Sequence, residues 1–449
     1  MKQKETNQIL NRLSELLQLI NTQEYETFVL PLSDYSNQSR SIYNGDNKIV
    51  LRGQDAFNRV ESIVELFWDC DREIRQTLSR QVVEEKIIEL IFHCQNTRTQ
   101  PTINTLDQIS RELRQLQKQE YLAVRFIHGA SLDQSLVKLG PFTIYKWDAY
   151  QSALASTNLP FLDSCLQNAR ELQKNNISSP SKFPLLENCG NIFISVEVAA
   201  RDKQRAIELA DDRFHQFEDV ISYMLGHEAR RFSFGVVDSS NINSLEYLLI
   251  TTGGIYHDTG SLHNPEPVEL DSLFFMNDKL KSSGADEVQF WVNSGHTWIW
   301  ETLKLEPLKL SKWQGRILSA IEWIGKGLRD KNSARSLVQF TFALEALFFY
   351  QEKGILASPS IVSTLADFSA FIGADNFKDR EFIIKTVNEI YGERSSVAHG
   401  GTQDVQSHTV SLALKLLKNL ITRIITNSEL SSFQSIEQLQ NWIKERKYS

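Results

Sequence analysis

The segment SARSLVQFTFALEALFFYQEKG, residues 333–354, decides the fold of the last third of this 449-residue chain. Its apolar side chains run through it almost without interruption and without proline, which predicts a helix buried inside a bundle. Helical periodicity continues on both sides, at residues 307–328, 359–373, 376–401 and 409–427. Pro307 stands near the start of the first of these stretches, where a helix tolerates proline. The sequence therefore predicts a four- or five-helix bundle domain over residues 305–449.

The middle of the chain, residues 120–304, mixes strand and helix patterns. Short runs rich in β-branched and aromatic residues predict strands at residues 120–132, 142–147, 191–200, 246–254, 267–270 and 287–293. Residues 201–225 have helical periodicity, and we expect their charged side chains to lie on the face away from the sheet. No catalytic motif occurs here, so we interpret the region as a mixed α/β sensing or regulatory domain.

Residues 1–119 predict a helical N-terminal region. Residues 7–20 and 58–92 carry apolar side chains at three- and four-residue steps. A further helix is expected from Thr105, a candidate N-cap, to residue 120. Together the three regions predict a mostly helical, multidomain α+β chain.

Composition is that of an ordinary globular protein, with 41% hydrophobic and 23% charged residues. The net charge of −8 argues against a general nucleic-acid coat protein. The cysteines at positions 70, 94, 165 and 189 have no CxxC spacing, so neither a metal site nor a disulfide framework is indicated. We find no signal-peptide pattern and no spanning segment, and we expect a cytoplasmic protein without a membrane or cofactor.

One pair of residues carries chemistry. Arg394 and His399 lie in the stretch YGERSSVAHGG, residues 391–401, and His399 alone among nine histidines has an arginine five positions before it. Histidine exchanges protons near neutral pH, and arginine grips phosphate oxygens with a planar fork. RNA supplies its own nucleophile, the 2′-hydroxyl, so this pair could cleave RNA without a metal. Helix capping by His399 and Gly400 is the alternative interpretation.

The spacing of the pair sets a geometric condition. Five residues of an ideal helix turn roughly 140° beyond a full circle, so Arg394 and His399 do not share a face. They can converge if the helix end distorts at Gly400 and Gly401, or if Arg394 reaches around the helix. A two-fold dimer could also bring two pairs around one cleft.

Two neighbours of the pair bear on the site. Glu345 is a carboxylate within the apolar stretch ALEAL, and an unpaired charge there would be costly. Either Arg394 pairs with Glu345 and is oriented by it, or Glu345 faces solvent at the edge of the bundle. Tyr391 stands one turn before Arg394, and we interpret it as a packing residue.

The last 140 or so residues resemble a HEPN domain, and within that group the ApeA-type proteins. The resemblance rests on the tryptophan-bearing and apolar stretch at residues 323–348, on ERSSVAHGG at residues 393–401, and on the amphipathic helix that follows. It implies a metal-independent ribonuclease with Arg394 and His399 as catalytic residues, Glu345 and Ser395 in support, and a homodimer. Many members carry Asn, Asp or His where this chain has Ser395.

Two functions from different classes follow from the resemblance. The first is an endoribonuclease effector, a toxin or abortive-infection protein in anti-phage defence, whose first two thirds sense a phage-derived trigger. The second is a catalytically silent HEPN module for dimerisation or RNA binding in a larger assembly. The presence of both Arg394 and His399 favours catalysis.

Other patterns lead to no site. GHEARR, residues 226–231, lacks the second histidine of a metalloprotease, and TTGGIYHDTG, residues 251–260, lacks the P-loop lysine and predicts a turn between strands. Basic residues outnumber acidic ones over residues 304–335, which indicates either a solvated helix face or a local basic groove. We expect Trp291, Trp298 and Trp300 to belong to the core.

Overall fold

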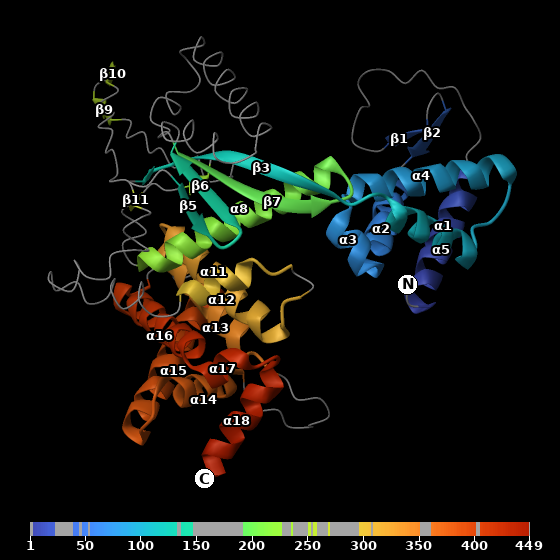
Figure 1. Cartoon of the computed structure of the whole chain (residues 1–449). Helices are drawn as coiled ribbons and strands as arrows, with labels where there is room; N and C mark the ends of the chain where they lie inside the picture. The colour runs from blue at the N-terminus through green and yellow to red at the C-terminus, as the bar shows by residue number, and fades with distance from the viewer. Residues whose placement is uncertain are drawn as a thin grey trace. The chain divides into compact units, whose positions relative to one another are not determined.

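The computed structural model is mostly helical, with a small antiparallel sheet in the middle of the chain (Figure 1). This agrees with the expected mostly helical α+β class. The residues that the structure describes are 3–22, 39–44, 47–52, 54–132, 136–146, 192–226, 235–236, 250–252, 255–257, 268–269, 296–306, 309–350, 361–400 and 405–448. The strand expected at residues 287–293 and Trp291 lie outside them.

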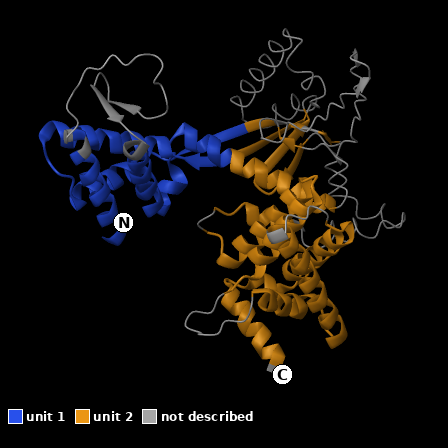
Figure 2. Cartoon of the chain, turned by 180° about the vertical axis from the view of Figure 1, so that it is seen from behind, with its two compact units in different colours: residues 1–123, 197–210 blue, residues 124–196, 211–449 orange. Residues whose placement is uncertain are grey.

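The chain divides into two compact units, coloured separately in Figure 2. Unit 1 comprises residues 1–123 and 197–210, and unit 2 comprises residues 124–196 and 211–449. The boundaries fall inside β3 (Gln119–His128), β7 (Ile192–Ala200) and α8 (Lys203–Leu225). The expected division at residues 119 and 304 stays a prediction.

Unit 1 is built around five helices with one apolar core. They are α1 (Gln3–Thr22), α2 (Gln54–Cys70), α3 (Arg72–Thr77), α4 (Arg80–Thr97) and α5 (Ile103–Gln115). Isoleucine, leucine and valine side chains from all of these helices, with Phe67 and Phe92, form the core. Two strands, β1 (Ser39–Asn44) and β2 (Asn47–Arg52), pair antiparallel. Residues 1–119 were expected to be helical throughout, and this pair of strands is an exception.

Two local expectations for unit 1 were wrong. The continuous pattern over residues 58–92 forms three helices, because Asp71 accepts hydrogen bonds from the amides of Glu73 and Ile74 and so begins α3. The N-cap of α5 is Thr102, whose hydroxyl accepts from the amide of Thr105. Thr105 is the third helical residue and returns a hydrogen bond, which completes a capping box.

The sheet has five strands in the order β5-β6-β7-β3-β8, with β5 (Leu136–Leu139), β6 (Phe142–Lys146) and β8 (Gly235–Val236). The pairs β5–β6, β6–β7 and β3–β8 are antiparallel. Strands were expected at β3, β6 and β7, and the structure confirms them. β9 (Ile250–Thr252) also pairs antiparallel with β10 (Ile255–His257), so strands lie on both sides of residues 253–254, where a turn was expected and which are not described. Elsewhere β11 (Val268–Glu269) pairs parallel with β4 (Ala130–Ser131).

Helix α8 lies along the sheet, as expected (Figure 1). Phe217 of α8 packs against Phe142 of β6, with ring centroids 5.1 Å apart. Trp300 of α11 (His296–Leu303) packs on both rings and is buried, so this tryptophan belongs to the core. Apolar side chains from a strand and two helices therefore join the sheet to the helices that follow it.

The charged residues of α8 do not all lie on a solvent face, so that expectation was wrong. Glu218 and Asp219 are each only 1% exposed. Glu218 accepts a hydrogen bond from the backbone amide of Val236 at 2.7 Å and contacts His215 at 3.3 Å. Asp219 forms an ion pair with Arg329, a residue of α12 (Lys312–Arg329), at 2.6 Å. Such partners offset the cost of burying the carboxylates.

The second half of α8 is thus part of the helical core of unit 2. At its C-terminal end the side chain of Lys418, on α16 (Ser407–Thr426), lies 5.4 Å from the centre of the Tyr223 ring.

The helices after residue 308 group together in the yellow-to-red part of Figure 1. They are α12, α13 (Ser333–Phe348), α14 (Ile361–Gly373), α15 (Phe377–Gly400), α16, α17 (Ser428–Ser432) and α18 (Ile436–Tyr448). The expected helices are present, but α12 begins after Ser311, whose side chain completes a capping box with Gln314, and not near Pro307. Helices α17 and α18 were not expected. Whether this group is a HEPN bundle stays a prediction.

Candidate functional site

Helix α15 carries both residues of the predicted catalytic pair. It begins after Asn376, whose side-chain oxygen accepts from the amide of Asp379 at 3.0 Å, and it stays helical through Gly400. The described part of α15 includes Gly400, and Gly401 lies outside the described residues, so the distortion expected at the double glycine stays a prediction. His399 lies in the last turn, and its side chain lies outside the described part of the structure. His399 and Arg394 can then act on one phosphate if the long Arg394 side chain reaches around the helix, or if a second copy of the chain supplies one of the two residues.

Arg394 is half-buried, and its side chain makes no hydrogen bond or ion pair with the residues that the structure describes. Its Nε atom is buried and makes no hydrogen bond. Among the arginines whose side chains the structure describes, the others without a hydrogen bond or ion pair are exposed: Arg12, Arg72 and Arg98. Burying a donor without a partner usually costs about 1–3 kcal/mol. Arg394 therefore has a buried donor, Nε, without a hydrogen-bond partner.

Glu345 finds its partner in Tyr391. The phenol of Tyr391 on α15 donates a hydrogen bond of 3.0 Å to Oε1 of Glu345 on α13. No ion pair between Glu345 and Arg394 occurs among the ion pairs of the described residues. The sequence indicated correctly that Glu345 needs a partner. That partner is Tyr391, and not Arg394 as we had expected.

Tyr391 packs in the core, as expected, and is only 8% exposed. Burial raises the pKa of its phenol well above the ordinary value of 10, and the charge of Glu345 and the hydrogen bond to it raise this pKa further. The positive charge of Arg394 acts in the opposite direction and lowers the pKa. Glu345 and Arg394 thus both lie within electrostatic range of the same hydroxyl group, which keeps its proton at neutral pH.

A second contact joins α15 to α16. The hydroxyl of Thr409 donates a hydrogen bond of 2.8 Å to Oε1 of Glu393, and Oε2 of Glu393 is buried without a hydrogen bond. Neither residue stood out in the sequence, because the contact joins two different helices. Ser395, the predicted supporting residue after Arg394, is exposed on α15. The structure brings Tyr391, Glu345 and Arg394 together and leaves Ser395 on the solvent side.

Six of the eight basic residues of 304–335 have acidic or carbonyl partners. Acidic side chains pair with Lys304, Lys309, Lys326, Arg329 and Arg335. Arg316 instead donates hydrogen bonds to backbone carbonyls at the end of α13, those of Ala346 at 2.8 Å and Phe349 at 2.9 Å. The local basic groove considered from the sequence finds no support in these residues.

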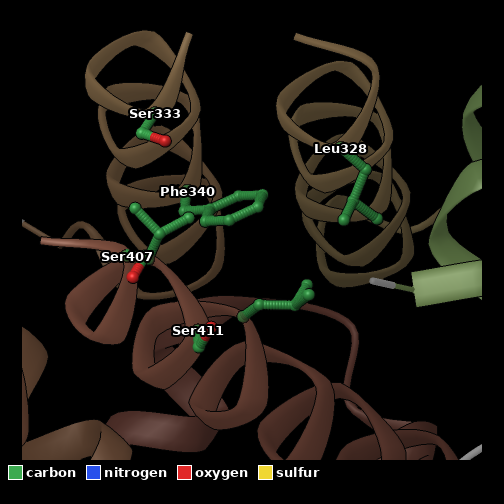
Figure 3. Close-up of a pocket in the computed structure, with 7 residues that line it drawn as sticks. Leu328, Ser333, Phe340, Ser407 and Ser411 are labelled. Carbon is green, nitrogen blue, oxygen red and sulfur yellow. The ribbon is translucent and has the colours of Figure 1, made fainter. Parts of the chain in front are cut away.

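A small cavity lies between α12, α13 and the start of α16, with a volume of about 90 Å³ (Figure 3). Phe340, Leu328, Val410 and Leu414 supply its apolar lining, and hydroxyl groups come from Ser333, Ser407 and Ser411. Neither Arg394 nor Glu345 lines it. Pockets for whole small molecules are usually several times larger, so this cavity does not extend the candidate site.

The described residues show neither a metal centre nor a membrane-spanning helix. Within them, no three His, Cys, Asp or Glu side chains are grouped closely enough to hold a metal ion. No described helix combines the length and the apolar character that crossing a membrane requires.

Comparisons with known proteins found no match for this chain among protein-family models, curated proteins or solved structures.

Proposed function

We propose that this chain is a metal-independent endoribonuclease of the HEPN type, similar to the ApeA group, with Arg394 and His399 at its catalytic centre. The observation that supports the proposal most is the half-buried guanidinium of Arg394, which has no ion pair or hydrogen bond among the described residues and lies on the same helix as His399. An arginine in this state has its donors ready for the oxygens of a phosphodiester.

The proposed chemistry uses the substrate's own nucleophile. The 2′-hydroxyl loses its proton and attacks the adjacent phosphorus, and the bond from phosphorus to the 5′-oxygen breaks as the new bond forms. His399 takes the proton of the 2′-hydroxyl or supplies the proton that the leaving 5′-oxygen gains, and water exchanges the other proton. Arg394 binds the non-bridging oxygens, where negative charge increases. The products are a 2′,3′-cyclic phosphate and a 5′-hydroxyl, and no metal takes part in any step.

A homodimer is part of the proposal, on a basis different from the expected one. The apolar side chains of α16, which suggested a dimer surface, are covered within one chain, with Leu414, Leu417 and Ile421 at most 2% exposed. On α15, in contrast, Phe377 is 79% and Phe382 is 63% exposed. Large exposed apolar side chains on the helix that carries Arg394 favour contact with a second copy there.

The biological role in the proposal is anti-phage defence by abortive infection or toxicity in the cytoplasm. The α/β region, with α8 packed into the helical core, is then the part that senses a phage-derived trigger. Asp219 on α8 pairs with Arg329 on α12, so a change in the sensing region has a direct physical contact with the catalytic region.

The test compares the wild type with Arg394→Ala and His399→Ala. Purified proteins are incubated with a mixed RNA pool in the presence of EDTA, and growth of cells expressing each protein is followed in parallel. We expect His399→Ala to lose about two to four orders of magnitude in cleavage rate. RNA binding without cleavage by the wild type would instead support the silent binding module and contradict catalysis.

A further inference from the structure

The relation between Glu345, Tyr391 and Arg394 is unusual for opposite charges in a half-buried setting. The carboxylate of Glu345 accepts a hydrogen bond from the phenol of Tyr391, and Arg394 lies one helical turn after Tyr391 on α15. Glu345 nevertheless makes its hydrogen bond to Tyr391, and Nε of Arg394 has no hydrogen bond. Attraction between unlike charges is stronger where water is partly excluded, so an ion pair between them is the expected arrangement. Something in the structure must compete with it.

The competitor is the phenol. Tyr391 precedes Arg394 by three residues on α15, so the two side chains leave the helix as neighbours on one face. Its hydroxyl group reaches Oε1 of Glu345 at 3.0 Å and satisfies a carboxylate oxygen that otherwise needs a donor. Hydrogen bonds to a charged group stabilise by about 1.5–3 kcal/mol, which is comparable with a partly exposed ion pair.

We propose that Tyr391 is a positioning residue that holds the Glu345 carboxylate away from Arg394 and so keeps the guanidinium free for a phosphate of the substrate. The inference rests on the proposed function, in which Arg394 binds the phosphodiester. It differs from the expected arrangement, in which Glu345 itself orients Arg394. A carboxylate paired with Arg394 would compete directly with the substrate phosphate for the same donors.

Thr409 restrains a second carboxylate close to Arg394, in the same way as Tyr391 restrains Glu345. Its hydroxyl occupies Oε1 of Glu393, the residue just before Arg394. Neighbouring side chains on a helix diverge by about 100°, so Glu393 points away from Arg394 and needs less restraint than Glu345. The positioning role therefore belongs to Tyr391.

The burial of Tyr391 lets this hydrogen bond persist across the working pH range. Its raised pKa keeps the phenolic proton in place at neutral pH and above, so the donor is not lost by ionisation. Removing the hydroxyl by substitution is then the direct way to release Glu345.

The experiment measures how fast p-hydroxyphenylglyoxal, an arginine-selective reagent, modifies Arg394. Peptide mass spectrometry follows the modification in the wild type, Tyr391→Phe, Glu345→Gln and the double variant. Exposed Arg98 and the ion-paired Arg329 serve as fast and slow internal controls. We expect Tyr391→Phe to slow modification of Arg394 by roughly five- to tenfold, because Glu345 becomes free to pair with it.

The double variant decides between positioning and packing. Glu345→Gln removes the competing charge, so Tyr391→Phe together with Glu345→Gln should recover the wild-type rates of Arg394 modification and RNA cleavage. Unchanged reactivity of Arg394 in Tyr391→Phe, or no recovery in the double variant, would overturn the inference. If Arg394 reactivity follows the expected pattern while the wild type cleaves no RNA, the positioning role stands and the proposed ribonuclease function fails. If the wild type cleaves RNA but Arg394 reactivity does not follow that pattern, the ribonuclease function stands and the positioning role fails.

Discussion

Gly325 of α12 crosses Asp219 of α8 so closely that a Cβ atom at position 325 would lie 2.5 Å from the Cα atom and carbonyl oxygen of Asp219. Both atoms of Asp219 belong to the backbone, so one helix would have to move to make room. The crossing brings the Asp219 carboxylate within reach of Arg329, one turn further along α12. A glycine in mid-helix, normally a weakness, is thus what allows α8 to join the helical core.

Gly325→Ala should therefore destabilise unit 2. We expect the free energy of unfolding to fall by about 3 kcal/mol, in the range for overpacked cores. The matched control is Gly315→Ala on the same helix, where no atom outside the neighbouring residues and backbone of α12 lies within 4 Å of the added Cβ. That variant should gain about 0.5–1 kcal/mol from helix propensity. Denaturant unfolding measures the free energy of unfolding of both variants. Equal changes in the two variants would contradict a close contact between Gly325 and Asp219.

Asp219 predicts a pH dependence of stability. Burial raises its pKa from 3.8 to about 7, with Glu322 and Glu218 also raising it and Arg329 and Lys326 lowering it. Between about pH 4 and 7 the folded chain then retains a proton that the unfolded chain has lost. This contribution to stability is present below pH 4 and is lost as the pH rises through 7.

Asp219→Asn tests that prediction, because an amide does not titrate. We expect the free energy of unfolding of the wild type to fall relative to that of the variant as the pH rises from 4 to 8. Parallel pH profiles for the two proteins would show that Asp219 stays ionised in the folded state.

Because Thr409 donates a hydrogen bond to Glu393, replacing Thr409 should lower the free energy of unfolding more than replacing a threonine that has no side-chain partner. Thr409→Val leaves Oε1 of Glu393 without its donor, beside an Oε2 that already has none. We expect a loss of about 1–3 kcal/mol. Thr386→Val on α15 is the control, because the Thr386 hydroxyl bonds only to the carbonyl of Phe382 one turn earlier. Thermal unfolding should lower the midpoint of Thr409→Val much more than that of Thr386→Val.

The exposed phenylalanines of α15 predict the surface of the homodimer. Light scattering after size exclusion should give twice the chain mass for the wild type at micromolar concentration. Phe377→Ser together with Phe382→Ser should give the monomer mass, since the patch loses its apolar area. Ile361→Ser, at another exposed apolar position, is the control and should leave the mass unchanged. A monomeric wild type would remove the dimer from the account.

The helices of the last third were predictable because their signals are local. The apolar run of residues 333–348 and the helical pattern of residues 376–401 indicate where α13 and α15 lie, and the structure has both. The features that the sequence did not predict depend on contacts between residues far apart in the chain. Asp202 accepts a hydrogen bond from the amide of Ser79, which lies just before α4 and 123 residues away in sequence. Periodicity alone could not indicate that residues 58–92 break there.

In the candidate site, too, features within one helix were predicted from the sequence, and contacts between helices were not. Arg394 and His399 form a sequence motif, so their presence on one helix was predicted. Glu345 was recognised as a charge in an apolar stretch, but its partner depends on how α13 packs against α15. Tyr391 was correctly interpreted as a packing residue, whereas its hydrogen bond to Glu345 arises only in the folded bundle. Spacing along one helix says nothing about which hydroxyl faces which carboxylate.

The central claim is that Arg394 and His399 cleave RNA through its own 2′-hydroxyl. The most direct measurement maps the ends of the products that the purified wild type makes from a mixed RNA pool in EDTA. The account predicts 2′,3′-cyclic phosphate and 5′-hydroxyl ends, no cleavage of DNA, and cleavage slower by about two to four orders of magnitude in Arg394→Ala and His399→Ala. Cleavage that requires added magnesium, or products with 3′-hydroxyl ends, would contradict it.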